Sequence, residues 1–326
     1  MMGPDFTGDR FADRMILVRR DKGGNISCMS HSNRIIVLLG PTASGKTATA
    51  LHMAQKENGV IINCDALQCY ADLAIVTARP TPEEMHQAPH RQFGVWDARD
   101  MGNAKRWQEE VIPQIHAVQA AGQVPILVGG TGMYVKGLYE GLAHLPELDE
   151  GVRGQVAALS GEQAWHALQQ EDAVMAAQLE PADTQRVKRA LEVMRSTGAS
   201  LSEWQSHPAD TPFDPAQFTY YAMQMARETL YAKINHRVEH MWDQGAVEEV
   251  AALAQQFTPE ELASGRFPLL KAIGVPEILA YQAGELTRDE AIATMQRNTR
   301  RYAKRQMTWI RGQVERLTWL ESPASS

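Results

Sequence analysis

The sequence predicts an α/β fold in which helices cover a parallel sheet and a helical segment is inserted into the chain. Three observations predict it. Short apolar runs alternate with helix-like segments between residues 34 and 140, as in parallel sheets covered by helices. A glycine-rich turn follows the first apolar run. Strand signals then disappear between residues 141 and 210, where alanine-rich helical periodicity takes over.

This division predicts three parts. Residues 34–140 and 211–326 would form the core, residues 141–210 a helical insertion domain, and residues 1–33 a flexible leader with mixed charges and no continuous apolar run. The chain has 326 residues, of which 44% are apolar, so it can bury a sizeable core.

Composition also limits the function. The formal net charge of −7 restricts any nucleic-acid surface to a local patch. The three cysteines have neither zinc spacing nor a disulfide framework, which favours a reducing, cytoplasmic compartment. No apolar run approaches the length that crosses a membrane, so we expect no membrane partner.

The first strand, expected at 35–39, leads into a phosphate-binding loop. Its spacing of glycines, followed by Lys46 and Thr47, matches the loop of P-loop NTPases, and a helix-like segment starts at Ala48. Backbone N–H groups and the helix N-terminus would bind phosphates, Lys46 would reach the terminal phosphate, and the Thr47 hydroxyl would hold Mg²⁺. The loop consists of Gly40, Pro41, Thr42, Ala43, Ser44, Gly45, Lys46 and Thr47.

Two further strands end beside this loop. The strand expected at 60–64 is followed by Asp65, and the strand expected at 124–128 is followed by a Gly-Gly-Thr-Gly turn that contains Thr131 and no carboxylate. In an open parallel sheet these ends would line one crevice. Taken alone, Asp65 is equally consistent with a residue that caps a loop.

Between these strands we expect a strand at 93–97 and a helix from 104 to 121, which Gly122 would end. In the insertion, Asp183 and Thr184 predict the start of a helix through Val193, which Gly198 would end. Cations in its first turns oppose the helix dipole, which fits a bound polyanion. From these residues alone, a solvated face with ordinary salt bridges is slightly favoured. The cations are Arg186, Lys188 and Arg189.

The C-terminal part predicts a strand at 218–222 and a long helix from Arg227 to about Gln256, with Arg237 beside its apolar stripe. A last helix is expected at 291–310. No acidic residue lies between Ala291 and Val314, and a basic helix with interleaved aromatics suits RNA. A basic helix paired with acidic neighbours is the alternative. Its basic residues are Arg297, Arg300, Arg301, Lys304, Arg305 and Arg311.

Several separated blocks together resemble the tRNA dimethylallyltransferases, over residues 34 to 320. Besides the phosphate loop, they are Asn63–Tyr70, Thr77–Thr81, Pro89–Arg91, Val128–Tyr134, Asp183–Val193, Lys271–Gly274 and Thr299–Trp309. The resemblance implies transfer of a dimethylallyl group from dimethylallyl pyrophosphate to N6 of adenosine 37, in tRNAs that read codons beginning with U. The products would be N6-dimethylallyladenosine and pyrophosphate.

The resemblance also assigns roles. Asp65 matches the family's general base, Thr131 would stabilise the leaving group, and Arg237 matches its pyrophosphate-side arginine. It implies Mg²⁺ as cofactor, the tRNA anticodon stem-loop and dimethylallyl pyrophosphate as partners, and a monomer with no obligate protein partner. The tRNA-binding residues would be Asp65, Ala66, Leu67, Gln68, Thr131, Arg153, Gln185, Arg186, Val187, Lys188, Arg189, Lys271, Gly274, Arg300, Arg301, Lys304 and Arg305.

Three rival functions differ in the ligand they require. A P-loop kinase or ATPase would convert ATP to ADP, usually with an acidic residue after a second strand. A prenyltransferase acting on AMP or ADP would need no basic terminal helix. An RNA-binding module without catalysis would leave the phosphate loop unexplained.

Overall fold

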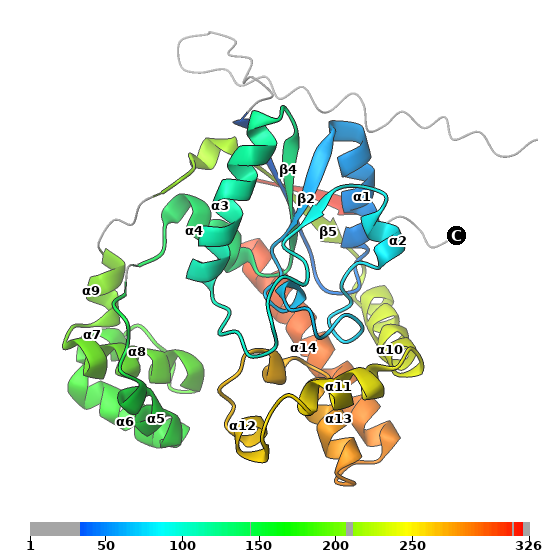
Figure 1. Cartoon of the computed structure of the whole chain (residues 1–326). Helices are drawn as coiled ribbons and strands as arrows, with labels where there is room; N and C mark the ends of the chain where they lie inside the picture. Colours follow the sequence, from blue (N-terminus) through cyan, green and yellow to red (C-terminus); the bar gives the residue numbers. More distant parts are fainter. Residues whose placement is uncertain (1–32, 144, 207–210, 315, 322–326) are drawn as a thin grey trace, which may run out of the picture.

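The computed structural model describes residues 33–143, 145–206, 211–314 and 316–321, so the leader predicted at 1–33 lies outside it except for Asn33. Its centre is a six-stranded sheet of order β3-β2-β4-β1-β5-β6, in which every pair of neighbours is parallel (Figure 1). This confirms the predicted α/β fold. The strands are β1 (Ile35–Leu39), β2 (Gly59–Asn63), β3 (His90–Arg91), β4 (Val124–Gly129), β5 (Phe218–Gln224) and β6 (Leu317–Glu321).

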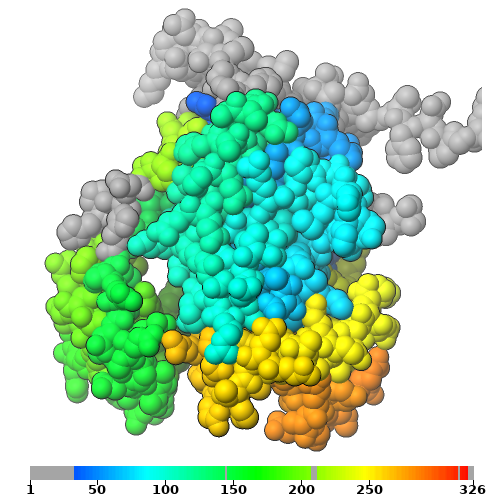
Figure 2. Space-filling model, viewed as in Figure 1, coloured from blue at the N-terminus to red at the C-terminus, as the bar shows by residue number. Residues whose placement is uncertain are grey.

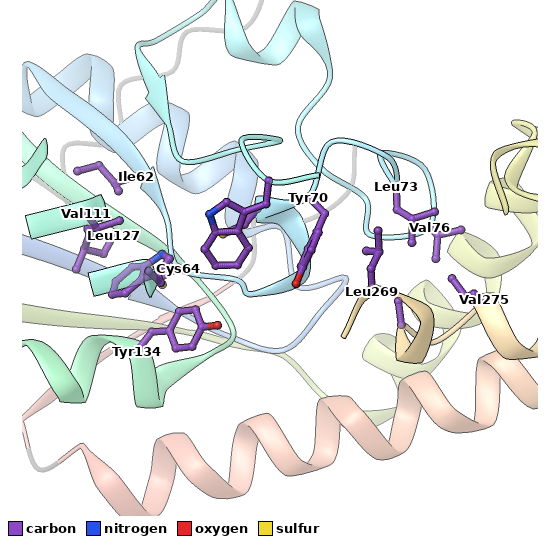
Figure 3. Close-up of a cluster of buried hydrophobic side chains, with 14 of the residues drawn as sticks. Ile62, Cys64, Tyr70, Leu73, Val76, Val111, Leu127, Tyr134, Leu269 and Val275 are labelled. Atoms are coloured by element: carbon purple, nitrogen blue, oxygen red, sulfur yellow. The ribbon is translucent and has the colours of Figure 1, made fainter. Parts of the chain in front are cut away.

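Both faces of the sheet are buried, which explains why its central strands are apolar at every position. Along β1, Ile35, Val37 and Leu39 belong to one apolar cluster, and Ile36 and Leu38 belong to another. Helix α1 (Lys46–Glu57) covers the smaller cluster. Helix α3 (Ala104–Ala120) packs on the larger cluster, part of which is drawn in Figure 3.

The remaining helices form two groups. The insertion has its own apolar cluster, to which Val156, Leu168 and Leu191 contribute, and Figure 2 shows an opening between it and the core. The insertion helices are α5 (Glu150–Ala158), α6 (Gly161–Glu171), α7 (Ala173–Ala176), α8 (Thr184–Thr197) and α9 (Leu201–Ser206). The others are α2 (Pro82–Met85), α4 (Gly132–Glu140), α10 (Arg227–Asp243), α11 (Ala246–Ala254), α12 (Pro259–Ala263), α13 (Val275–Gln282) and α14 (Arg288–Gln313).

The structure corrects three expectations. The strand expected at 93–97 is wrong: the strand in this region is β3, and positive φ angles at Gln92 and Gly94 (65° and 60°) bend the chain after it. The single helix expected from Arg227 to Gln256 is two helices, because Gly245 has a φ of 100°. The edge strand β6 was not predicted, since three of its five residues are exposed and it lacks the continuous apolar run of the central strands.

Helix termini were predicted more accurately. Asp183 caps α8, because its side chain accepts a hydrogen bond from the Arg186 N–H, and the left-handed Gly198 ends that helix. Helix α3 ends at Ala120, just before the left-handed Gly122. No helix in the described ranges is long and apolar enough to cross a membrane.

Candidate active site

The carboxyl ends of three neighbouring strands meet at one edge of the sheet, as predicted. Strand β1 leads into the phosphate loop, β4 into the Gly130–Thr131 turn, and β2 into Asp65. Because β4 lies between β1 and β2, the turn stands between the loop and the carboxylate. The Thr131 N–H donates to the Cys64 carbonyl at 3.3 Å, which ties the turn to the end of β2.

The phosphate loop has the backbone that its glycines predicted. Ala43 and Gly45 both have positive φ, and a Cβ on Gly40 would lie 2.9 Å from the Met223 Cβ. The Lys46 ammonium donates to the Gly40 and Pro41 carbonyls at 3.0 and 2.9 Å. A phosphate that entered the loop would compete with these carbonyls for the ammonium group.

Three charged side chains act on one another here. Burial, and secondarily Arg237, lowers the pKa of Lys46 to about 8, although Asp65 opposes the shift. Burial also acts to lower the pKa of Arg237, whose guanidinium nevertheless remains charged. Arg237 donates to the Thr42 hydroxyl at 3.3 Å, so it lies against the loop. Two poorly solvated cations therefore lie at the phosphate loop, where they favour a bound anion.

Asp65 presents one oxygen to the turn. Its Oδ1 accepts a hydrogen bond from the Leu67 N–H at 3.1 Å, whereas Oδ2 lies 3.7 Å from the position of a Cβ on Gly130. Burial raises the pKa of Asp65, against the influence of Lys46 and of hydrogen bonds from the Leu67 and Gln68 backbone. A partly desolvated carboxylate with one oxygen anchored is a suitable proton acceptor.

Two site residues were missed by the sequence analysis, Gln306 and Tyr302 of α14. Gln306 is buried, and its Oε1 accepts a hydrogen bond from the Thr42 N–H of the phosphate loop at 3.0 Å. Burial, and then Asp65, raises the pKa of Tyr302, while hydrogen bonds with Thr131 and Gln306 oppose the shift. Helix α14 therefore touches the phosphate loop and the turn at once. Tyr302 and Gln306 are four residues apart and therefore lie on one face of α14, which is the signal that could have identified them.

Helix α14 also carries the predicted basic surface. Within the described residues, none of the six basic side chains between Arg297 and Arg311 has an ion pair, which removes the alternative of pairing with acidic neighbours. Arg300 donates to Asn235 Oδ1 at 2.6 Å and lies over the Tyr231 ring, and Arg305 lies over Tyr302. Unneutralised cations are available to a polyanion.

The cations of α8 are arranged differently. Arg186 pairs with Asp183 and Arg189 with Glu192, both at 3.3 Å. The Lys188 ammonium donates to the Ala157 carbonyl at 2.8 Å. These contacts agree with the ordinary salt bridges favoured from the sequence, although the arginines stay exposed.

The other predicted tRNA-binding residues are either exposed or buried. Arg153, Gln185 and Lys271 are exposed, and Val187 and Gly274 are buried. Val187 is fully buried in the core of the insertion, so its side chain is not available to a ligand. Gly274 has a φ of 112°, which indicates a turn that favours glycine.

Residues 66–68, which follow Asp65, are fixed by contacts with neighbouring parts of the core. The Gln68 amide donates to the Thr77 and Ala78 carbonyls at 3.0 and 3.1 Å. Ala66 and Leu67 pack against the large apolar cluster, and the Ala66 N–H donates to the Thr131 hydroxyl at 3.4 Å. The segment is thereby fixed against the turn.

The few protein oxygens at the phosphate loop suit a magnesium ion that is held mainly by the phosphate oxygens of a bound substrate. No group of three or more His, Cys, Asp or Glu side chains arranged to hold a metal occurs in the described part of the chain. Thr47 is the second residue of α1, directly after the loop, and the hydroxyl of Ser44 in the loop is buried without a hydrogen-bond partner. Such a site fits Mg²⁺ bound through one or two protein oxygens, phosphate oxygens and water.

Comparison with known proteins gives concordant results. The model of the family described as IPP transferase matches residues 68–313. A tRNA dimethylallyltransferase of Sphingopyxis alaskensis is 46% identical over 278 residues, which cover 85% of this chain and 89% of that protein. The tRNA isopentenylpyrophosphate transferase of Bacillus halodurans has a solved structure that is 31% identical, with a TM-score of 0.65, covering 90% of this chain and 91% of that one. A eukaryotic dimethylallyltransferase solved acting on tRNA is 27% identical, with a TM-score of 0.73, covering 89% and 74%.

Proposed function

The chain belongs to the IPP transferase family and is a tRNA-prenylating enzyme, and we propose that it transfers a dimethylallyl group to N6 of adenosine 37 in tRNAs that read codons beginning with U. The observation that carries the proposal is the convergence of a phosphate loop, two cations and a single partly buried carboxylate at one edge of the sheet. A phosphate loop whose neighbouring strand β4 is followed by Gly130 and Thr131, and by no carboxylate, fits reaction at carbon and not at phosphorus.

The proposed reaction assigns each group one role. The bond between C1 of the dimethylallyl group and the pyrophosphate oxygen breaks, and a bond between C1 and N6 of adenine forms. N6 is a weak nucleophile because its lone pair is delocalised into the ring. Asp65 Oδ2 takes the N6 proton as the new bond forms, and pyrophosphate leaves with the bonding electrons.

Stabilisation of the leaving group falls to the loop. Lys46 and Arg237, the two cations at the loop, would neutralise the charge that develops on the departing pyrophosphate. Mg²⁺, held by the Thr47 hydroxyl and phosphate oxygens, would supply further neutralisation of charge. Thr131 joins the turn to the base, because its hydroxyl accepts from the Ala66 N–H.

The tRNA is proposed to lie along α14, where the cations are unpaired, and to extend toward the insertion through Arg153, Gln185 and the exposed arginines of α8. Adenosine 37 has to leave its stack to reach Asp65, at a free-energy cost of a few kcal/mol that the RNA contacts would offset. The chain is further proposed to act as a monomer in the reducing cytoplasm, in keeping with Cys64 and Cys69, which are buried and unpaired.

One acceptor series tests this function. The purified full chain is incubated with labelled dimethylallyl pyrophosphate, Mg²⁺ and one of four acceptors: a tRNA for UNN codons, the same tRNA with G37, a tRNA for a CNN codon with A37, and AMP. Label is expected only in the first. Transfer to AMP, transfer to the G37 variant, or equal transfer to the CNN tRNA would each contradict a stated part of the proposal. An ATP requirement would favour the P-loop ATPase instead.

A further inference from the structure

Asn63, the last residue of β2, occupies an unusual position. It is fully buried, and it lies two residues before Asp65. Its Oδ1 accepts the Asp65 N–H at 2.8 Å. Its Nδ2 lies 2.9 Å from the Asp65 carbonyl, 3.0 Å from the Gln92 carbonyl and 3.2 Å from Cys69 Sγ. One side chain thus holds both backbone polar groups of the residue that carries the carboxylate.

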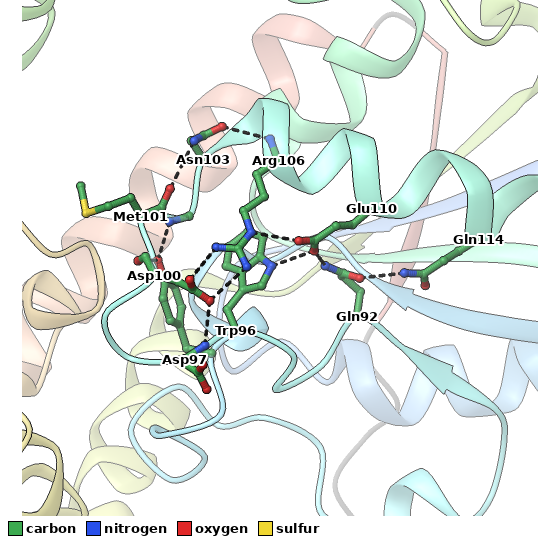
Figure 4. A network of polar contacts seen from close by, with 11 residues as sticks. Gln92, Trp96, Asp97, Asp100, Met101, Asn103, Arg106, Glu110 and Gln114 are labelled. Atoms are coloured by element: carbon green, nitrogen blue, oxygen red, sulfur yellow. Dashed lines mark hydrogen bonds and ion pairs between the residues drawn. The ribbon is translucent and has the colours of Figure 1, made fainter. Parts of the chain in front are cut away.

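The anchor behind Asn63 is itself rigid. The Gln92 carbonyl that accepts from Asn63 belongs to a buried residue with a φ of 65°, a conformation that non-glycine residues adopt only when neighbours hold it. The Gln92 side chain donates to Glu110 and accepts from Gln114. Glu110 also accepts from Trp96 and Arg106, so the whole network rests on α3 (Figure 4).

We propose that Asn63 is a positioning residue for the reaction, which aligns the Asp65 carboxylate with the acceptor amine through a hydrogen-bond network fixed on α3. This inference rests on the proposed role of Asp65 as general base. The N–H groups of residues 65, 66 and 67 donate to Asn63 Oδ1, Thr131 Oγ1 and Asp65 Oδ1 in turn. Three successive backbone N–H groups at Asp65 and just after it therefore have fixed partners, while Oδ2 is left directed toward the Gly130–Thr131 turn.

The expected effect follows from geometry. Without Asn63 the strand end can rotate, and a displacement of about 1 Å in a reacting group can cost about a hundredfold in rate. Asn63→Ser keeps an oxygen that can accept the Asp65 N–H but loses the amide Nδ2 that donates to the Asp65 and Gln92 carbonyls. We expect single-turnover transfer to slow by about ten- to a hundredfold, with the dissociation constant for RNA and the KM for dimethylallyl pyrophosphate changed less than threefold.

A double-mutant cycle separates positioning from loosening of the fold. Rates are measured for wild type, Asn63→Ser, Asp65→Asn and the double variant, with thermal unfolding recorded for each. If Asn63 acts through Asp65, its replacement costs no further rate once residue 65 is Asn. The matched control is Gln282→Ala, which removes a side-chain amide that donates to the Val247 carbonyl outside this network, and it is expected to stay within about threefold of wild type.

The outcomes are distinct. An Asp65→Asn enzyme as fast as wild type removes the general base and with it the proposed mechanism. Two results overturn the positioning role alone, provided that Asp65→Asn is slow. In the first, Asn63→Ser transfers at the wild-type rate. In the second, Asn63→Ser slows transfer by the same factor in the wild-type and in the Asp65→Asn background. If Asn63→Ser fails to fold, Asn63→Thr, which fills more of the buried site and keeps an uncharged oxygen as acceptor for the Asp65 N–H, is put through the same cycle. It is judged by the same criteria.

Discussion

The pKa of Lys46 leads to a prediction about the pH dependence of substrate use. In the proposed function its ammonium form binds the diphosphate, and burial lowers its pKa to about 8 before the substrate enters. Diphosphate binding favours the protonated lysine, so the pKa of Lys46 is higher in the complex than in the free enzyme. The contribution of Lys46 to diphosphate affinity is therefore fully present below the free-enzyme pKa and is lost as the pH rises toward the pKa of the complex. At pH 7 about nine-tenths of these side chains carry the proton, and at pH 9.5 only about 3% do.

We therefore expect kcat/KM for dimethylallyl pyrophosphate, at saturating anticodon stem-loop RNA, to fall about thirtyfold between pH 7 and pH 9.5. Asp65 cannot cause this loss, because its raised pKa makes the rate fall as the pH decreases. In Lys46→Ala the value should be low at pH 7 and should not decline further. A wild-type profile that stays level to pH 9.5, or a Lys46→Ala profile that falls in parallel with it, would refute this account of the lysine.

Two further predictions concern the RNA surface and the strand ends. Replacing Arg300, Arg301 and Arg305 with Ala should weaken RNA binding and reduce the slope of log affinity against log salt concentration by about 2 to 3. Replacing the ion-paired Arg186 and Arg189 should change that slope less. RNA binding measured over a salt series tests this, and equal slopes for the two sets of variants would contradict the distinction. Gly129→Ala should lower the free energy of unfolding by about 1–3 kcal/mol, because its Cβ would lie 2.6 Å from the Cys64 carbonyl oxygen. The control Gly154→Ala, in α5 with nothing within 4 Å, should raise it by about 0.5–1 kcal/mol, and thermal unfolding that ranks the two variants in the opposite order would be inconsistent with the packing.

Much of the fold could be predicted from the sequence because its signals are local. Strand β1, the phosphate loop and the start of α1 are contiguous, so one stretch of chain predicts all three. The meeting of Asp65 with Thr131 also followed, because parallel strands bring their carboxyl ends to one edge. Irregular backbone was harder to predict. The positive φ at Gln92, which shortens β3 to two residues, is imposed by Glu110 and Asn63, and neither is a sequence neighbour.

The unpredicted part of the site depends on distant contacts. Thr42 and Gln306 are 264 residues apart, and only the path of α14 across the sheet edge brings them together. The basic pattern of α14 predicted an RNA surface but gave no indication that Tyr302 and Gln306 on the same helix contact Thr131 and the phosphate loop. The α8 segment had two open explanations, and its ion pairs agree with the one favoured from sequence.

The central claim is that Asp65 takes the proton from the attacking amine, and Asp65→Asn tests it most directly. The amide keeps the shape and removes the proton acceptor, a loss that typically costs about a hundredfold to ten-thousandfold in rate. Single-turnover transfer and equilibrium RNA binding are measured on the same variant, with RNA binding expected to change far less than the rate. Transfer within a few-fold of wild type, or a rate and an RNA affinity that fall together, would contradict the role of Asp65 as the general base.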